Sequence, residues 1–175
     1  GIDPASRRRA VFLDRDGVIN RAVVRDGKPY PPARVEDVDL LPGVADALRQ
    51  LHEAGFRLVV VTNQPDVARG NQRREIVDAI HDRLASVLPI DEFRVCPHDD
   101  GDRCACRKPK PGLLLDAARA AGIDLSASFM VGDRWRDVEA GRRAGCTTIF
   151  IEHEYAEGRP DESDMIVRSL SEAVH

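Results

Sequence analysis

The stretch Ala10-Val11-Phe12-Leu13-Asp14-Arg15-Asp16-Gly17 decides the fold, because a short apolar run ends there at two carboxylates. Residues two apart in a strand point to the same face, so two aspartates would repel each other there unless a cation lies between them or they do different chemical work. The carboxyl end of a strand is also where open α/β sheets bind their ligands. The alternative reading of this stretch is an acidic turn with Gly17 at the bend.

The composition is that of an ordinary globular protein. Of 175 residues, 42% are hydrophobic and 32% are charged, which fits a single domain over residues 1–175 with a sizeable core. We expect residues 1–8 to be disordered or left over from an expression tag. The net charge of −4 argues against a nucleic-acid partner, and the apolar runs are too short for a membrane span. No signal peptide is visible, so we expect a cytoplasmic protein. We also expect it to be a monomer.

Strand-like and helix-like segments alternate along the chain. The expected strands are 10–13, 56–61, 93–96, 129–131, 147–151 and 165–167, and the expected helices are 43–54, 73–88, 111–121, 138–144 and a short terminal one. The proline-rich segment 18–42 is expected to be irregular and to cover a site. The pattern predicts an α/β fold with a doubly wound, Rossmann-like parallel sheet, helices on both faces and no large cap domain.

Polar residues follow three of these strands. Asp14 and Asp16 follow the first, Thr62-Asn63-Gln64 follows the second, and Asp133 follows the fourth, with Asp137 four residues later. A doubly wound sheet gathers such ends in one cleft. Clustered carboxylates need a counter-charge, and an open set of oxygen ligands favours Mg²⁺. A carboxylate can also attack phosphorus and form an aspartyl-phosphate.

Lys108 is the natural second cation of this cleft. It lies in Arg107-Lys108-Pro109-Lys110-Pro111-Gly112, a loop before a helix, where positive charge suits a bound anion. The alternative is a solvated surface charge.

In this order and spacing, the motifs around Asp14, Thr62, Lys108 and Asp133 resemble the haloacid dehalogenase phosphatase superfamily, over about residues 10 to 152. The resemblance implies that Asp14 is the nucleophile and that Asp16 is the general acid and then the base. It implies that Asp14, the backbone carbonyl of Asp16 and Asp133 hold Mg²⁺, while Asp137 supports the water molecules bound to the metal. Thr62 and Lys108 would hold the phosphoryl oxygens, and Asn63 and Gln64 would contact the substrate.

A second metal is predicted at residues 96–106. Three thiols and one imidazole, from Cys96, His98, Cys104 and Cys106, are a normal ligand set for structural Zn²⁺. Four protein ligands leave no open position, which disfavours a catalytic zinc; a reduced, metal-free loop is the remaining alternative. Zinc would fix the loop that carries Arg107 and Lys108.

This cysteine and histidine pattern, followed by Arg107-Lys108-Pro109, resembles a small branch of the superfamily that acts on D-glycero-D-manno-heptose 1,7-bisphosphate or on histidinol phosphate. Motifs such as Ala68-Arg69-Gly70 favour a phosphorylated sugar, with loss of the C7 phosphate of the heptose. The five-residue gap between His98 and Cys104 favours histidinol phosphate. The resemblance assigns Arg107 to the distal part of the substrate, with a salt bridge to the zinc loop as its alternative; Arg134 is a weaker candidate.

Two other classes carry acids at strand ends. A polynucleotide phosphatase shares the Asp-x-Asp motif, but the chain's five Phe, two Tyr and one Trp form no cluster for stacking bases. A receiver-like phosphate-sensing domain is the non-enzymatic alternative. Asp16 argues against it, because a receiver donates no proton to a leaving alcohol.

Overall fold

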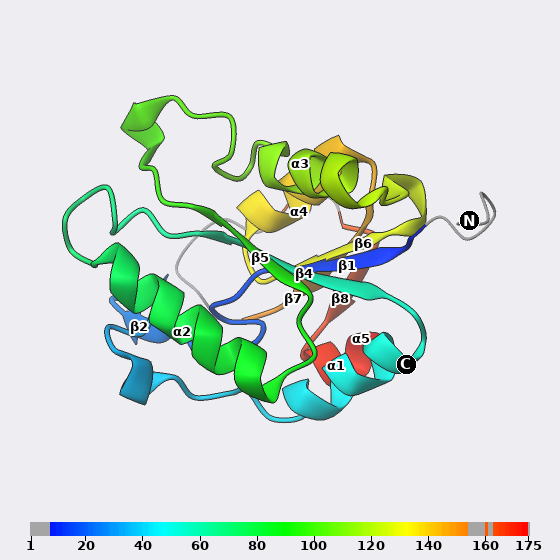
Figure 1. Cartoon of the computed structure of the whole chain (residues 1–175), viewed down its shortest axis with the longest axis horizontal. Helices are drawn as coiled ribbons and strands as arrows, with labels where there is room; N and C mark the ends of the chain where they lie inside the picture. Colours follow the sequence, from blue (N-terminus) through cyan, green and yellow to red (C-terminus); the bar gives the residue numbers. More distant parts are fainter. Residues whose placement is uncertain (1–7, 154–159, 161–162, 175) are drawn as a thin grey trace.

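A parallel sheet of six strands forms the centre of the computed structural model, which describes residues 8–153, 160 and 163–174. The strand order is β5-β4-β1-β6-β7-β8 (Figure 1). The strands are β1 (Ala10–Leu13), β4 (Arg57–Asn63), β5 (Glu92–Cys96), β6 (Phe129–Gly132), β7 (Thr147–Ile151) and β8 (Met165–Val167). The expected doubly wound sheet is confirmed, and β1 lies between β4 and β6, where the direction of winding changes.

Helices cover both faces of the sheet, as expected (Figure 1). One face packs against α1 (Val44–Glu53), α2 (Arg74–Val87) and α5 (Leu170–Val174), and the other against α3 (Gly112–Ala121) and α4 (Trp135–Ala144). In β1, Val11 and Leu13 join the first of these cores, and Ala10 and Phe12 join the second. Strand alternation therefore places apolar side chains on both faces, which is why β1 is apolar throughout.

The segment 18–42 is not wholly irregular, so that expectation was wrong in part. It contains a hairpin of β2 (Val23–Arg25) and β3 (Lys28–Tyr30), followed by a short 3-10 helix, η2 (Val35–Asp37). The two-residue turn is Asp26-Gly27, and both residues have positive φ angles, 52° and 75°. Asp-Gly favours this mirror-image turn, and it was the sequence signal for the hairpin.

The element boundaries differ slightly from the expected ones. The helix α4 begins at Trp135 rather than at residue 138, because Asp137 accepts hydrogen bonds at the first turn. Two further 3-10 turns, η3 (Asp100–Asp102) and η4 (Leu125–Ala127), fall in connections. Of the residues expected to be disordered, 1–7 lie outside the described residues, and Arg8 already pairs with Ile123. Among the described helices, none has the length and apolarity needed to cross a membrane.

Candidate active site

The polar segments meet at the carboxyl edge of the sheet. Because β1 pairs with both β4 and β6, Asp14, Thr62 and Asp133 extend from three neighbouring strands. A cavity of about 290 Å³ opens at this edge. The predicted site residues that line it are Asp14, Asp16, Asn63, Arg107, Lys108, Arg134 and Asp137. The other predicted residues of the cleft, Thr62, Gln64 and Asp133, are buried.

Lys108 is buried and donates three hydrogen bonds, so it is not a surface charge. Its ammonium nitrogen Nζ donates to Oδ1 of Asp14 at 2.9 Å and to Oδ1 of Asp137 at 2.5 Å. A third bond runs to the backbone carbonyl of Val61 at 3.0 Å. Burial alone would lower the pKa of Lys108, but the carboxylates of Asp137 and Asp14 outweigh it and raise the pKa above its usual range. The lysine therefore carries a fixed positive charge in the cleft.

The surroundings of Asp14 disfavour the charged form of its carboxyl. Burial, and then the negative charge of Asp137, raise the pKa of Asp14 to about 6, although Lys108 acts in the opposite direction. Burial and the charge of Asp137 together therefore outweigh the effect of Lys108 on this carboxyl. A further cation beside Asp14 would lower this pKa and favour the carboxylate.

Three buried carboxylates could hold that cation. Asp14, Asp133 and Asp137 can each offer one oxygen, and these oxygens lie within 4.8 Å of one another. Hard oxygen donors in a buried, partly open cluster suit Mg²⁺ better than a soft metal. Asp14 and Asp133 are two of the magnesium ligands expected from the sequence, and Asp137 is the residue expected to support the bound water molecules.

Asp137 is held by the turn between β6 and α4. Its Oδ2 accepts from the backbone N–H groups of Asp133 at 3.2 Å and Arg134 at 3.1 Å. This packing requires a glycine at the end of β6, because a Cβ atom on Gly132 would lie 2.0 Å from the Cβ atom of Asp137. The apolar strand and its terminal glycine thus fix the position of one carboxylate of the cluster.

Asp16 lies apart from this cluster and has four hydrogen-bond donors around it. Oδ1 accepts from Nε of Arg15 and from the Asn20 amide, each at 3.0 Å. Oδ2 accepts from Nη2 of Arg15 at 3.2 Å and from the Gln64 amide at 3.1 Å. Burial would raise the pKa of this carboxyl, but the guanidinium and the two amides hold the pKa of Asp16 below its usual range.

The Thr62-Asn63-Gln64 segment supports its neighbours. The Asn63 amide exchanges two hydrogen bonds with the backbone of Lys108, and the Gln64 amide donates to Thr62 Oγ1 at 2.9 Å as well as to Asp16. The amides of Asn63 and Gln64 bind protein groups in this structure. The substrate contacts expected of these two residues stay predictions.

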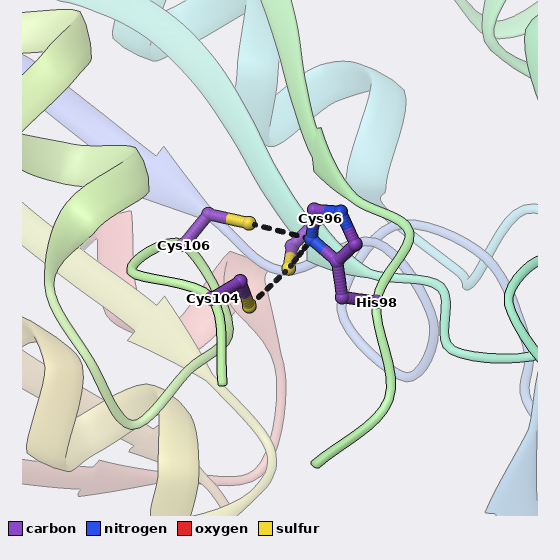
Figure 2. Close-up of side chains that lie close together, drawn as sticks. All are labelled: Cys96, His98, Cys104 and Cys106. Atoms are coloured by element: carbon purple, nitrogen blue, oxygen red, sulfur yellow. Dashed lines mark hydrogen bonds between the residues drawn. The ribbon is translucent and has the colours of Figure 1, made fainter. Parts of the chain in front are cut away.

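The four predicted zinc ligands come together. Figure 2 shows Cys96, His98, Cys104 and Cys106 turned toward a common point, and their ligand atoms lie within 4.8 Å of one another. Nδ1 of His98 lies 3.6 Å from Sγ of Cys96 and 3.4 Å from Sγ of Cys106. Burial raises the pKa of Cys96 above its usual range, so its thiolate needs a cation beside it. The cluster has the composition of a structural zinc site.

The rim of the cavity is rich in cations beyond Arg107 and Arg134. Lys28 on the hairpin, Arg69 and Arg136 also line it. Nη1 of Arg107 donates to the backbone carbonyl of His98 at 3.2 Å, which joins the rim to the cysteine and histidine cluster. Sequence reasoning named Arg69 only as part of the Ala68-Arg69-Gly70 motif and missed Lys28 and Arg136, because the three cations come from separate segments. The hairpin turn was the one available signal for Lys28.

Comparison with known proteins agrees with this geometry. Residues 12–145 match the model of the haloacid dehalogenase-like hydrolases, a match that covers Asp14, Asp16, Lys108 and Asp133. The chain belongs to this family. The predicted superfamily is thereby confirmed, and the hydrolase is favoured over the receiver-like alternative.

The chain is similar along most of its length to named members of the hydrolase family. It is 41% identical over 162 residues to D-glycero-beta-D-manno-heptose-1,7-bisphosphate 7-phosphatase of Rhodopseudomonas palustris, covering 86% of this chain and 87% of that one. It is 38% identical to the Escherichia coli enzyme of the same name, covering 93% and 90%. Its structure resembles D,D-heptose 1,7-bisphosphate phosphatase from B. bronchiseptica, complexed with magnesium and phosphate, with a TM-score of 0.81, 32% identity and coverage of 95% and 96%.

Sequence reasoning also missed two residues next to the hydrolase site. Arg15 stands between the two aspartates in the sequence, and its side chain is fully buried. Its Nη1 lies 3.0 Å from Nε2 of His81 on α2. The sequence signal was weak in both cases. An arginine between two acids reads as a surface ion pair, and His81 lies four residues after Val77 and three before Leu84, on the apolar stripe of its helix.

Proposed function

We propose that this chain is a Mg²⁺-dependent phosphatase that removes the C7 phosphate of D-glycero-D-manno-heptose 1,7-bisphosphate through an aspartyl-phosphate intermediate. The observation that carries the proposal is the position of Lys108, which bonds Asp14 within a cluster of carboxylates at the strand ends. The substrate follows from the relatives, which are named for this reaction and match nearly the whole chain.

In the first half of the proposed reaction, a carboxylate oxygen of Asp14 attacks phosphorus. The new bond joins that oxygen to phosphorus, and the bond between phosphorus and the sugar oxygen breaks. The negative charge of the bound phosphate raises the pKa of Asp16 and lets its carboxyl exchange one amide donor for a proton. Asp16 gives that proton to the departing sugar oxygen, so the sugar leaves as an alcohol. Thr62 and Lys108 hold the phosphoryl oxygens while charge shifts between them.

In the second half, a water molecule attacks phosphorus of the aspartyl-phosphate. Asp16 takes a proton from this water, in the carboxylate form that its four donors favour. Inorganic phosphate leaves, and the Asp14 carboxylate is restored. The same side chain thus acts first as acid and then as base.

Magnesium would be held by Asp14, Asp133 and the backbone carbonyl of Asp16, with Asp137 supporting the water molecules bound to it. When bound, it supplies positive charge that lets an anionic carboxylate approach an anionic phosphate. The oxygens of Asp14, Asp133 and Asp137, which lie within 4.8 Å of one another, support a cation at this position.

Zinc at the cluster of Cys96, His98, Cys104 and Cys106 would have a structural role. It would close the polar loop between the ligands and hold Arg107 at the rim. A second phosphate of the substrate would bind among the rim cations, since guanidinium groups pair well with phosphate. We expect the enzyme to act in the cytoplasm, where reduced cysteines are available to zinc. We also expect it to act as a monomer.

The decisive experiment measures Mg²⁺-dependent phosphate release from heptose 1,7-bisphosphate and from histidinol phosphate, with Asp14→Asn as the blank. We expect a strong preference for the heptose, with one phosphate released and the C1 phosphate retained. Histidinol phosphate is included because of the five-residue gap between His98 and Cys104. A preference for it would replace the proposed substrate, and equal release by Asp14→Asn would overturn the nucleophile.

A further inference from the structure

Arg15 has the largest side chain among the fully buried ones that the structure describes, with none of its surface exposed. A buried guanidinium is costly unless its N–H groups are paired. Its neighbours in sequence are the two aspartates, so a surface position would have been the ordinary outcome. What the guanidinium binds therefore indicates why it is inside.

The Arg15 guanidinium bridges the second aspartate and a helix. On one edge, Nε and Nη2 lie 3.0 and 3.2 Å from the two carboxylate oxygens of Asp16, in a bidentate pair. On the other side, Nη1 lies 3.0 Å from Nε2 of His81. A two-point contact fixes the plane of a carboxylate as well as its distance, which a single hydrogen bond does not do.

His81 is a fixed acceptor for this arginine. It lies in the middle of α2, is 6% exposed, and stacks on the Phe93 ring at 4.4 Å with an angle of 11° between the planes. An arginine has no acceptor, so Nε2 of His81 must be the unprotonated nitrogen. Burial, and then the charge of Arg15, lower the pKa of His81 to about 3, in agreement with a neutral ring.

The helix gains little from a histidine at this position. Its other buried residues are Val77, Ile80 and Leu84, all apolar. Replacing a buried polar network by apolar side chains is often neutral or stabilising, so stability alone does not account for the pair. The Arg15 side chain of this pair binds both oxygens of Asp16, which connects the pair to proton transfer.

We propose that Arg15 and His81 are positioning residues that hold the plane of the Asp16 carboxyl for proton transfer to the leaving oxygen. This inference rests on the proposed role of Asp16 as general acid. The chain of contacts runs from Phe93 through His81 and Arg15 to Asp16, so a change in α2 acts on chemistry at the end of β1.

The test compares two leaving groups in His81 variants. An alkyl alcohol such as the sugar needs a proton as it departs, whereas p-nitrophenolate departs without one. We expect His81→Leu to lower kcat/KM for the heptose bisphosphate by about 10- to 100-fold, part of what general acid catalysis contributes. For p-nitrophenyl phosphate the loss should stay below about threefold. The ratio kcat/KM reports only the steps up to formation of the aspartyl-phosphate. It is therefore independent of the later hydrolysis step, in which Asp16 also acts.

Two further variants separate positioning from folding. The amide oxygen of His81→Gln can take the place of Nε2, so it should restore most of the activity, while the shorter His81→Asn should not. Ile80→Ala, on the same buried stripe, is the matched control and should lower stability without changing the ratio between the two substrates. If His81→Leu does not fold, the comparison of Gln with Asn decides.

Equal losses on both substrates, or full activity of His81→Asn on the sugar, would overturn the positioning role. A failure of the proposed function would look different, because the unchanged enzyme would then hydrolyse neither phosphate ester in an Asp14-dependent way.

Discussion

The side-chain amide of Asn63 forms two hydrogen bonds with the backbone of Lys108. Oδ1 accepts from the Lys108 N–H at 3.1 Å, and Nδ2 donates to the Lys108 carbonyl at 3.2 Å. One residue at the end of β4 thus holds, from 45 positions away, the backbone of the lysine whose ammonium binds Asp14. An asparagine suits this task, because its amide has both a donor and an acceptor.

Asn63→Ala should therefore lower activity through Lys108. We expect a loss of about 1–3 kcal/mol in the free energy of unfolding, from two hydrogen bonds. We also expect kcat to fall by about 10- to 100-fold, because a small displacement of a catalytic group is costly. Urea unfolding and steady-state kinetics check the two parts. Asn71→Ala, an exposed position, is the control. An unchanged kcat would show that Lys108 keeps its place without this amide.

Gly132→Ala should disturb the carboxylate cluster. The added methyl group would meet the Cβ atom of Asp137 at 2.0 Å, and both residues are buried, one at the end of β6 and the other in the first turn of α4. We expect a destabilisation of about 1–3 kcal/mol together with weaker Mg²⁺ binding, measured by denaturant unfolding and by titration calorimetry. Gly101→Ala is the control, because a Cβ atom there meets nothing within 4 Å. Unchanged Mg²⁺ affinity in Gly132→Ala would show that the position of Asp137 does not affect Mg²⁺ binding.

The sequence predicted the strand ends well, because they are marked by a change from apolar to polar residues within one short stretch. Asp14 and Asp133 follow buried strands, and parallel pairing leaves such ends side by side. The hairpin of β2 and β3 was missed although Asp26-Gly27 signals it, because the nearby prolines indicated an irregular segment.

The buried arginine could not have been predicted in the same way. Alternation along a strand would send Arg15 to the face opposite to Asp16. The chain leaves the strand after Leu13, and Gly17 turns it with a φ of 88°, so Arg15 and Asp16 bind each other instead. Contacts of this kind depend on where the backbone turns in three dimensions, and periodicity carries no information about that.

Cys104→Ser should remove the proposed zinc. We expect zinc content to fall from about one ion per chain to near zero, with a lower melting temperature and lower activity, since metal binding supplies folding free energy. Elemental analysis and thermal unfolding measure this. Cys146→Ala is the control, because Cys146 is buried away from the four-residue cluster. Full activity in zinc-free protein assayed with Mg²⁺ would contradict a role for zinc in placing Arg107.

Arg107→Ala should weaken binding of the bisphosphate more than that of a monophosphate. The side chain lines the cavity and donates a hydrogen bond to the backbone carbonyl of His98, and we propose that the distal phosphate binds at this rim. We expect KM for heptose 1,7-bisphosphate to rise by about 10- to 100-fold, the value of a charged hydrogen bond, and KM for heptose 7-phosphate to change by less than about threefold. Arg119→Ala on the exposed face of α3 is the control. Equal effects on both substrates would remove Arg107 from recognition of the second phosphate.

The stability of the protein should depend on pH through His81. The folded side chain has a pKa of about 3, whereas the unfolded one titrates near 6.5, so below pH 6.5 protons bind the unfolded chain in preference. The stability that neutral His81 provides is complete above pH 6.5 and is lost as the pH falls toward 3. Between pH 7 and pH 5, the unchanged protein should lose about 2 kcal/mol more unfolding free energy than His81→Gln, which does not titrate. Urea unfolding of both proteins at each pH measures the difference, in which the other titrating groups cancel. Parallel pH profiles would mean that His81 can take up a proton in the folded state, and that Arg15 then lies farther from Nε2 than the 3.0 Å seen here.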